Sequence, residues 1–567
     1  MTKKNTKFLI YTIVALLLAT MVFLMFTSSS GDSATTDEST HIVSGYLANI
    51  DGDYNINTEH PYLGKKINTL PLLFMKVNLD RSEPYFAVKS DYYYDSWRES
   101  RQLGNNFLYK MGNDADQILR AVRSVPMILA LIFGLVFFII VSQLFGLWVG
   151  LLSLVFWVFS PDILAHSRFV NTDLWITVFY FLSITSYGYY LSKPNYKRLI
   201  LAAIILGLAL SVKFSSIILI PILFVLWVIK NQQVKQNIWL SVKQNILPVI
   251  IFLITSWIIV WANYGFSTLT PPKYQQVLDK DYYNQILVKT QSVARYFKPA
   301  EYYKGTVILS SNSFGNRPAY LLGEQKYGGW WYYFPVAFMV KTPLPILILI
   351  FGSIIFYLLR AKSRSTVQRK KLIFNDYLLI SPIIIYLLIS MAQKLNIGVR
   401  HLLPIMPFIF IWCAKLMVEF YNYLKNSKIN RSLVLIFFSF LVFWLIFGTI
   451  RIYPHFLSYF NETVGASNGS QVLSDSNIDW GQDIKRLKTW LDDHKITQPI
   501  LLEYYWDGDD SISYYGINYN KLERNDPTQK GYIAVGVSAV NNSEFSWLKN
   551  YKPIDQIGYS INIYNIK

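Results

Sequence analysis

The stretch "FLIYTIVALLLATMVFLM" (8–25) is an unbroken apolar run that follows three lysines near the start of the sequence. A helix needs about 20 residues to cross the hydrocarbon core of a bilayer, so this run is long enough for a membrane anchor. A cleaved signal peptide within residues 1–34 is the alternative, but its apolar core is usually shorter. We therefore predict a first membrane span over 8–28.

Comparable apolar runs recur along the 567 residues, of which 53% are hydrophobic and only 16% charged. A soluble protein of this length needs more polar surface to cover its core. The runs predict an all-α polytopic membrane protein with about eleven transmembrane helices. The expected spans are 8–28, 122–143, 145–160, 173–191, 198–212, 214–230, 246–264, 335–359, 375–392, 402–421 and 432–452.

Most of the net charge of +18 lies in short loops between these runs, so it indicates membrane topology and no nucleic-acid partner. The positive-inside rule then puts the N-terminus and the basic loop "RAKSRSTVQRKK" (360–371) in the cytoplasm of a multi-pass cell-membrane protein. Three polar segments fall outside the cytoplasm: 29–121, 265–334 and 453–567.

The last polar segment predicts a separate domain, with residues 1–452 as the transmembrane domain and 453–567 as a small extracytoplasmic α/β domain. Strand-like pieces, "PILLEYY" (499–505) and "GYIAVGVSAV" (531–540), follow a helical pattern in "DWGQDIKRLKTWLDDH" (479–494). The single cysteine, Cys413, excludes a disulfide within the chain.

Ionisable side chains gather at the expected outer ends of the spans, whereas the spans themselves carry few. A transporter usually has ionisable groups inside its spans, so chemistry at the outer membrane surface is favoured over transport. The residues concerned are Asp37, Glu38, Glu59, His60, Lys65, Arg120, Arg123, His166, Arg168, Asp173, Lys341, Arg400, His401 and His455.

Nucleotide sugars are absent outside the cytoplasm, so an activated sugar must arrive there on a lipid. Transfer from a polyprenyl phosphate to a hydroxyl needs a carboxylate as general base and cations that neutralise the departing phosphate. The outer residues supply both kinds of group.

Several stretches together resemble a known family. They are "DE" (37–38), "HPYLGKKI" (60–67), "SPDILAHSRFVNTDLWIT" (160–177), "GWWYYFPVAFMVKTPLP" (329–345), "NIGVRHLLPIMPF" (396–408), "YPHFLSYFNETVG" (453–465) and "DSNIDWGQD" (475–483). In order and topology they resemble the PMT-like phospholipid-carrier-dependent glycosyltransferases of the GT-C fold, which include protein O-mannosyltransferases and aminoarabinose transferases. The chain lacks a stretch like the MIR repeats of the eukaryotic enzymes, so their acceptor preference is not carried over.

The resemblance implies that Asp37 is the catalytic base and that its neighbour Glu38 orients a substrate. Glu59 and His60 match positions near the phosphate or a metal, where aminoarabinose transferases have a lysine in place of His60. Lys65 could supply that charge, as could Arg120 or Arg123. No cofactor is required; a divalent cation is the alternative, with Glu59, His60 and His166 as weak candidate ligands.

Other residues have two interpretations from sequence. Arg168 and Asp173 either pair to hold the end of a span or belong to the site. Lys341, Arg400 and His401 either anchor lipid headgroups or contact the donor phosphate. In the "DSNIDWGQD" stretch, Asp475 and Asp479 either bind acceptor or, as we favour, cap the following helix and contact the neighbouring domain.

The predicted function is transfer of a sugar from a polyprenyl-phosphate donor to an extracytoplasmic hydroxyl of a protein, lipid or glycan. A single displacement would invert the anomeric centre; a covalent intermediate would need a second carboxylate, for which Glu38 stays open. The alternatives are a lipid-linked-sugar flippase or polymer exporter without transferase chemistry, and a cell-surface scaffold.

Overall fold

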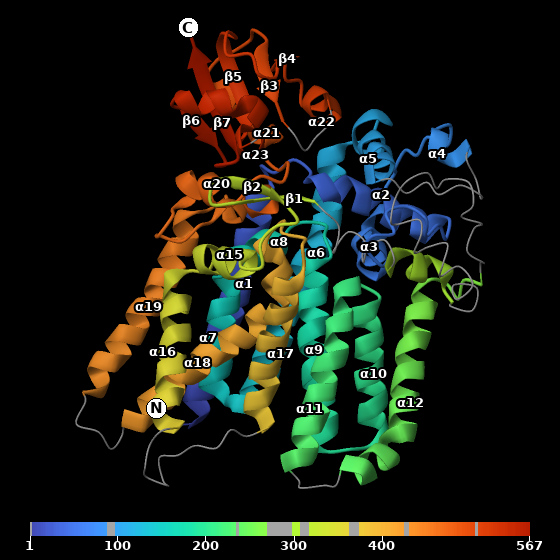
Figure 1. Ribbon diagram of the computed structural model, residues 1–567, viewed down its shortest axis with the longest axis vertical. Coiled ribbons are helices and arrows are strands. Elements are labelled where there is room, and N and C mark those ends of the chain that lie inside the picture. Colours follow the sequence, from blue (N-terminus) through green and yellow to red (C-terminus); the bar gives the residue numbers. More distant parts are fainter. Residues whose placement is uncertain are drawn as a thin grey trace.

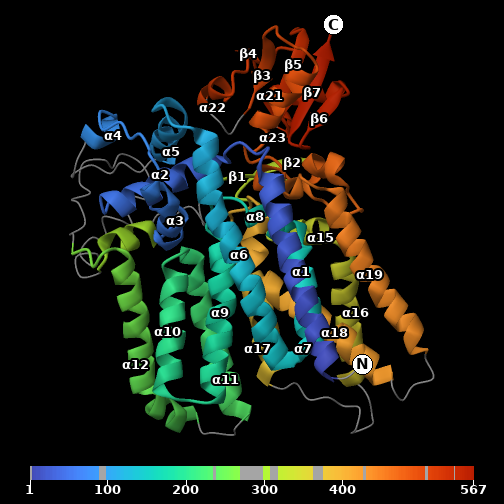
Figure 2. The same ribbon diagram turned by 180° about the vertical axis from the view of Figure 1, so that it is seen from behind.

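The computed structural model describes residues 3–87, 97–233, 238–268, 298–306, 317–361, 374–424, 430–504, 509–541 and 543–567. Figure 1 shows three layers: a bundle of long helices, a layer of short helices with a hairpin, and a small sheet at the C-terminus. The N-terminus lies at the end of the bundle farthest from the sheet, as Figure 2 shows from behind. We call the end of the bundle that carries the sheet the polar end.

The bundle consists of apolar helices. They are α1 (Lys3–Ser29), α6 (Ala115–Phe145), α7 (Leu147–Val158), α9 (Asp173–Ser192), α10 (Tyr196–Leu210), α11 (Leu219–Gln233), α12 (Ile238–Asn263), α16 (Leu344–Ala361), α17 (Phe374–Ala392), α18 (Met406–Tyr423) and α19 (Arg431–Arg451). Among the described residues, seven helices are long and apolar enough to cross a membrane, or eight if the bent pair α15 (Tyr333–Lys341) and α16 forms one span.

Each of the eleven predicted spans coincides with a helix, although not every helix is a full span. Helices α7 and α10 have only 12 and 15 residues, fewer than the roughly 20 that a bilayer requires. The span over 335–359 is broken, because α15 and α16 meet at an angle of 117°. The predicted fold class, a helical multi-pass membrane protein with a small C-terminal sheet, is confirmed.

Aromatic rings and a close glycine contact hold the bundle together. Phe133 of α6 packs edge-on against Trp157 of α7, with ring centroids 4.8 Å apart, and Phe181 of α9 lies 5.4 Å from Phe408 of α18. Helices α10 and α12 approach so closely that a Cβ on Gly207 would lie 2.6 Å from the Ser256 carbonyl oxygen. Small residues permit such contacts, which matter because lipid supplies no hydrophobic force between helices.

Short elements cover the polar end of the bundle. They are α2 (Thr36–Ile50), α3 (Leu63–Asn68), η1 (Leu70–Phe74), α4 (Pro84–Ala87), α5 (Trp97–Asn105), η2 (Asn106–Lys110), α8 (Pro161–His166), η3 (Phe214–Ile218), β1 (Pro318–Leu321), β2 (Glu324–Tyr327), η5 (Val399–Ile405), η7 (Phe456–Ser458), η8 (Ala466–Asn468), α20 (Gly469–Val472) and η9 (Asp475–Asn477). Glycines bring α2 against its neighbours: a Cβ on Gly45 would meet Lys65 O at 2.3 Å, and one on Gly104 would meet Ser39 O at 2.5 Å. Helix α2 is therefore fixed on two sides.

The C-terminal sheet has the order β4-β3-β5-β7-β6, in which β3 is parallel to β4 and β5 while β7 is antiparallel to β5 and β6. Its elements are α21 (Ile484–Asp493), β3 (Ile500–Glu503), α22 (Asp509–Tyr514), β4 (Tyr519–Lys521), β5 (Gly531–Gly536), α23 (Val537–Val540), η10 (Ser543–Asn550), β6 (Asp555–Ile557) and β7 (Ile561–Ile566). Helix α21 buries Ile484, Leu487 and Leu491, as its sequence period predicts.

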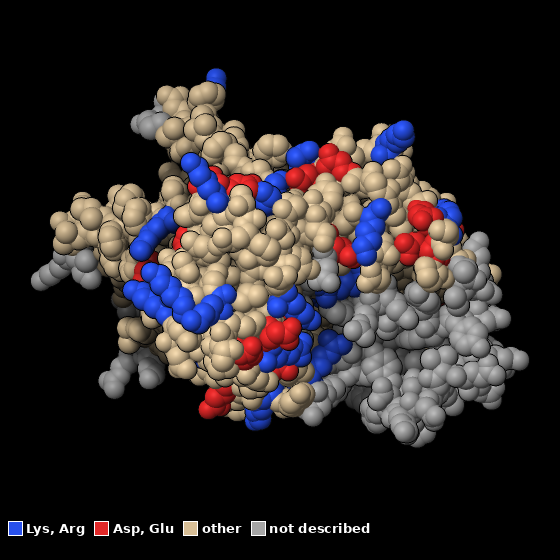
Figure 3. All heavy atoms as spheres, turned by 90° about the horizontal axis from the view of Figure 1, so that it is seen from above, with Lys and Arg blue, Asp and Glu red and all other residues tan. Residues whose placement is uncertain are grey.

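The surface at the polar end, seen from above in Figure 3, carries acidic and basic side chains interspersed.

Candidate functional site

Asp37 lies in the first turn of α2, at the polar end of the bundle. An acidic side chain is favoured there because the first backbone N–H groups of a helix have no partners within the helix. The Asp37 side chain is 22% exposed, and its Oδ2 lies 3.3 Å from Nη1 of Arg400. Asp37 is thus a carboxylate that remains open to a reactant while a cation holds it in place.

Glu38, in contrast, is fully buried and fully hydrogen-bonded. Its Oε1 accepts from Arg123 Nε at 2.8 Å and Val170 N at 2.9 Å. Its Oε2 accepts from Arg123 Nη2 at 2.6 Å and Thr35 N at 2.8 Å. The two adjacent carboxylates therefore have different surroundings: Asp37 is partly exposed, while Glu38 holds the start of α2 against α6 and the 167–172 loop.

A buried pair of cations stands next to Asp37. Asp173, at the start of α9, lies 2.5 Å from Lys213 Nζ through Oδ1 and 3.5 Å from Arg400 Nη1 through Oδ2. Arg400 therefore bridges Asp37 and Asp173. Lys213 and Arg400 thus bring two positive charges to the two carboxylates of Asp37 and Asp173, so the charges of this group balance.

Four histidines surround this group: His41 and His166 are buried, and His60 and His401 are half-buried. The rings of His41 and His60 lie 5.6 Å apart. Burial lowers the pKa of both residues well below the usual value, assisted by Lys65 for His41 and by Lys213 for His60. Burial also lowers the pKa of His166 to about 3. These imidazoles are therefore neutral at pH 7 and can donate or accept a hydrogen bond.

Several nitrogens of these rings are buried without a hydrogen-bond partner: His41 Nδ1, His60 Nδ1, both nitrogens of His166 and His401 Nε2. Buried polar atoms normally have partners, so an unpaired group of this kind calls for a ligand or water. Within the described residues, no group of three or more His, Cys, Asp or Glu side chains has the geometry of a metal site.

The remaining predicted residues are distributed around this centre. Lys65 is buried and donates to Asn57 O. Lys341 is buried and donates to Leu457 O and Asn477 O, both at 2.7 Å. Glu59 is partly exposed and lies 4.0 Å from Arg317, and Arg120 is exposed on α6.

Two sequence interpretations are wrong. Arg168 does not pair with Asp173; it forms an ion pair with Asp32 at 2.8 Å. Burial lowers the pKa of Arg168 to about 10, so its charge persists. Neither Asp475 nor Asp479 caps the following helix, because the N-cap position of α21 belongs to Asp483. Sequence proximity suggested each of these partners, whereas the actual ones come from distant segments.

Lys213 was missed from the sequence, although a signal was present. It follows the apolar run 198–212 and, by the predicted topology, falls on the side that should be poor in lysine. A lysine in a short loop that the positive-inside rule predicts to be outside the cytoplasm is unusual, and this indicates a functional role.

The buried Asp479 should make the stability of the protein depend on pH. Burial raises its pKa to about 7, while an exposed Asp titrates near about 3.9. Between these values the folded protein binds the extra proton, so this group makes stability fall as pH rises from about 4 to about 7. Thermal unfolding in detergent should show Asp479→Asn more stable than wild type at pH 8 by more than about 1.4 kcal/mol, the free energy of one pKa unit, with the difference vanishing near pH 4. The exposed Asp493→Asn should show none; a constant difference at all pH values would contradict the assignment.

Comparison with known proteins agrees with the resemblance found in the sequence. Residues 114–261 match the family model described as dolichyl-phosphate-mannose-protein mannosyltransferase. This part of the chain is PMT-like. The PMT-like segment runs from α6 into α12 and includes Arg123, Asp173 and Lys213.

Two solved structures are similar to this chain at low identity. ArnT from Cupriavidus metallidurans, bound to undecaprenyl phosphate, is 10% identical with a TM-score of 0.44, covering 97% of each chain. The oligosaccharyltransferase of Archaeoglobus fulgidus is 9% identical with a TM-score of 0.48, covering 99% of this chain and 74% of its own. No curated protein matches the sequence.

Proposed function

We propose that the protein transfers a sugar from a polyprenyl-phosphate donor to a hydroxyl group on the extracytoplasmic side, with Asp37 as general base. The observation that carries the proposal is the ion pair between the partly exposed Asp37 and the buried Arg400, which also contacts Asp173, the partner of the buried Lys213. The family name matched by residues 114–261 specifies a sugar on dolichyl phosphate, which belongs to the same chemical class.

Asp37 would take the proton of the acceptor hydroxyl as its oxygen attacks the anomeric carbon. The bond from that carbon to the phosphate oxygen breaks, and the phosphate leaves with a growing negative charge. Lys213 and Arg400 would stabilise this charge, since preorganised cations in a buried site act without reorganisation. The neutral His60 and His401 would contribute hydrogen bonds and not charge.

Single displacement with inversion is the step that this geometry supports best. A retaining reaction requires a second carboxylate as nucleophile, about 5–5.5 Å from the first. Glu38 has four donors on its two oxygens, so using it as a nucleophile would break the network that holds α2. We assign Glu38 and Arg123 to positioning.

The proposed orientation puts the sheet domain outside and the N-terminal lysines in the cytoplasm. Figure 1 shows the N-terminus and the α9–α10 connection at the same end of the bundle, opposite the sheet. Lys193 lies in that connection, and Lys197 and Arg198 lie in the first turn of α10. Basic residues on one side support this orientation through the positive-inside rule.

Lys213→Met should raise the KM for the lipid donor by about 10–100-fold, because a hydrogen bond to a charged group contributes about 1.5–3 kcal/mol. Lys213→Arg should recover part of the loss, since it keeps the positive charge. The exposed Lys193→Met, at the other end of the same helices, should behave as wild type. An unchanged donor KM in a folded Lys213→Met protein would remove Lys213 from the phosphate site.

The function itself is tested with purified protein and a panel of synthetic polyprenyl-phosphate sugars. Mass spectrometry should detect free polyprenyl phosphate and a glycosylated acceptor for at least one donor. If no donor is consumed, and cells without the protein accumulate no lipid-linked sugar and lose no extracytoplasmic glycan, the transferase proposal fails and an exporter or scaffold must be considered.

A further inference from the structure

The "DSNIDWGQD" stretch (475–483) has no assigned role in the proposed reaction, yet it contacts both the segment that leads into α2, which carries Asp37, and the start of η5, which carries Arg400. It leads from the polar end of the bundle into α21 of the sheet domain. Most of its contacts join residues far apart in sequence. We call residues 475–486 the clamp segment.

The clamp segment binds the backbone that immediately precedes Asp37. Ser33 N donates to Gln482 O and Thr36 N donates to Trp480 O, both at 2.9 Å. Ser33 Oγ donates to Gly481 O at 2.9 Å and accepts from Ile484 N at 3.2 Å. The polypeptide that leads into α2 is thus hydrogen-bonded to the clamp segment like a short piece of sheet.

Gly481 makes this approach possible. Its φ of +95° is a conformation that side chains disfavour. A Cβ there would lie 3.3 Å from Thr36 Oγ1 and 3.4 Å from Thr36 N. Glycine is required both by the backbone conformation and by the short distance to α2.

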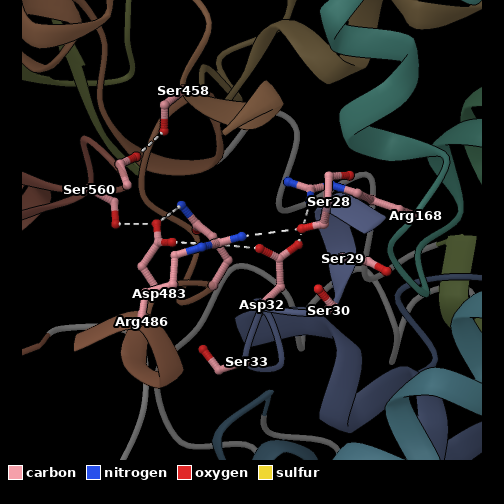
Figure 4. A network of polar contacts seen from close by, with 12 residues as sticks. Ser28, Ser29, Ser30, Asp32, Ser33, Arg168, Ser458, Asp483, Arg486 and Ser560 are labelled. Atoms are coloured by element: carbon pink, nitrogen blue, oxygen red, sulfur yellow. Dashed lines mark hydrogen bonds and ion pairs between the residues drawn. The ribbon is translucent and has the colours of Figure 1, made fainter. Parts of the chain in front are cut away.

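A buried charge network secures the same junction (Figure 4). Asp32 lies between two arginines, with Oδ1 2.5 Å from Arg486 Nη1 and Oδ2 2.8 Å from Arg168 Nη1. Arg486 also contacts Asp483 at 2.5 Å and donates to Ser28 O at 3.2 Å. Asp483 in turn accepts from Ser560 Oγ at 2.6 Å, which connects the network to the sheet.

The clamp segment is also hydrogen-bonded to the start of η5, the element that carries Arg400. Asn477 Oδ1 accepts from Val399 N at 2.9 Å, and Ser476 Oγ donates to Ile397 O at 2.7 Å. The buried ring of Trp480 stacks beneath the Arg400 guanidinium, whose carbon lies 4.2 Å from the ring centroid. Cation–π stacking of this kind restrains the guanidinium plane.

We infer that the clamp segment is a positioning device for the transfer reaction: it fixes Asp37 and Arg400 relative to each other, and Arg486 links that geometry to the sheet domain. This inference rests on the proposed function for its kinetic consequence, but its structural part stands alone. Arg486 and Ser33 touch neither Asp37 nor the phosphate-binding cations, so they are positioning residues. Misplacing a catalytic group by about 1 Å can cost about 100-fold in rate.

The experiment uses the full-length protein with Arg486→Met, the conservative Arg486→Lys and the milder Ser33→Ala. The matched control is Arg524→Met, which removes an exposed ion pair with Glu544 in the same domain. For each variant, kcat and the donor KM are measured, together with amide exchange over residues 31–40 and over β5 and β7.

We expect Arg486→Met to lower kcat about 10–100-fold at unchanged donor KM, to speed exchange over 31–40, and to leave exchange in β5 and β7 as in wild type. Arg486→Lys should recover part of kcat, Ser33→Ala should show a smaller loss, and the control should show none. The inference is contradicted if amide exchange over residues 31–40 in folded Arg486→Met is as slow as in wild type. It is also contradicted if this exchange is faster but kcat equals the wild-type value. If Arg486→Met does not fold, Ser33→Ala decides by the same criteria. If wild type transfers no sugar, the proposed function fails, and exchange over 31–40 still tests the clamp.

Discussion

Asp37→Asn should lower kcat by about 10²–10⁴-fold, the range that a general base contributes, while the donor KM stays near the wild-type value. The amide has the shape of the carboxylate and can still accept a hydrogen bond from Arg400, but it cannot take a proton from the acceptor. The measurement is transfer by purified protein, combined with mass spectrometry of lipids from cells that carry the variant. One polyprenyl-phosphate sugar should accumulate.

Asp51→Asn is the matched control for this experiment. Asp51 follows the same helix and forms an exposed pair with Arg81, so its loss should leave transfer unchanged. A folded Asp37→Asn protein that transfers sugar at the wild-type rate would exclude Asp37 as base and redirect attention to Asp173 or Asp475.

Arg123→Met should destabilise the protein by about 3–5 kcal/mol, the cost of leaving one partner of a buried ion pair alone. The side chains of Arg123 and Glu38 are 3% and 0% exposed. Without the guanidinium, the Glu38 carboxylate keeps only the backbone donors of Thr35 and Val170. Denaturant unfolding in detergent measures the change.

The double variant Glu38→Gln/Arg123→Met separates charge from packing. Gln removes the buried charge, but its single amide oxygen can replace only one of the two carboxylate oxygens that accept from Thr35 N and Val170 N. Only part of the lost stability should therefore return. Arg81→Met removes an exposed ion pair and should cost less than about 1 kcal/mol. Equal losses in the single and double variants would show that the charge of Glu38 is not the cause.

Local sequence patterns were sufficient to predict the membrane helices and the helix and strands of the small domain. The apolar period along 8–28 and the spacing of Ile484, Leu487 and Leu491 reflect burial, which a residue's own neighbours largely determine. The same patterns failed for the break between α15 and α16, because Thr342 and Pro343 sit inside a run that is otherwise apolar.

Partners in the site could not be predicted in this way. The donors to Glu38 lie 85 and 132 residues away at Arg123 and Val170, and only the packed bundle brings them together. Asp37, Asp173 and Arg400 all lie at predicted span ends, and the prediction that they lie near one another is confirmed. It gave the wrong partner for Arg168, because Asp32 becomes its neighbour only when α1 packs beside α8.

The hydrogen bonds between Ser33 and residues 481 and 482 also have a consequence for biosynthesis. The two sides of this junction are 448 residues apart, and chains are synthesised from the N-terminus at about 5–20 residues per second. The segment that leads into Asp37 thus emerges early and lacks its partners for tens of seconds, until residues 480–486 have been translated and translocated. Ribosome-bound nascent chains that include Arg400 but end before residue 480 should hold lipid donor without transferring sugar, so that transfer begins only after most of the spans have been inserted.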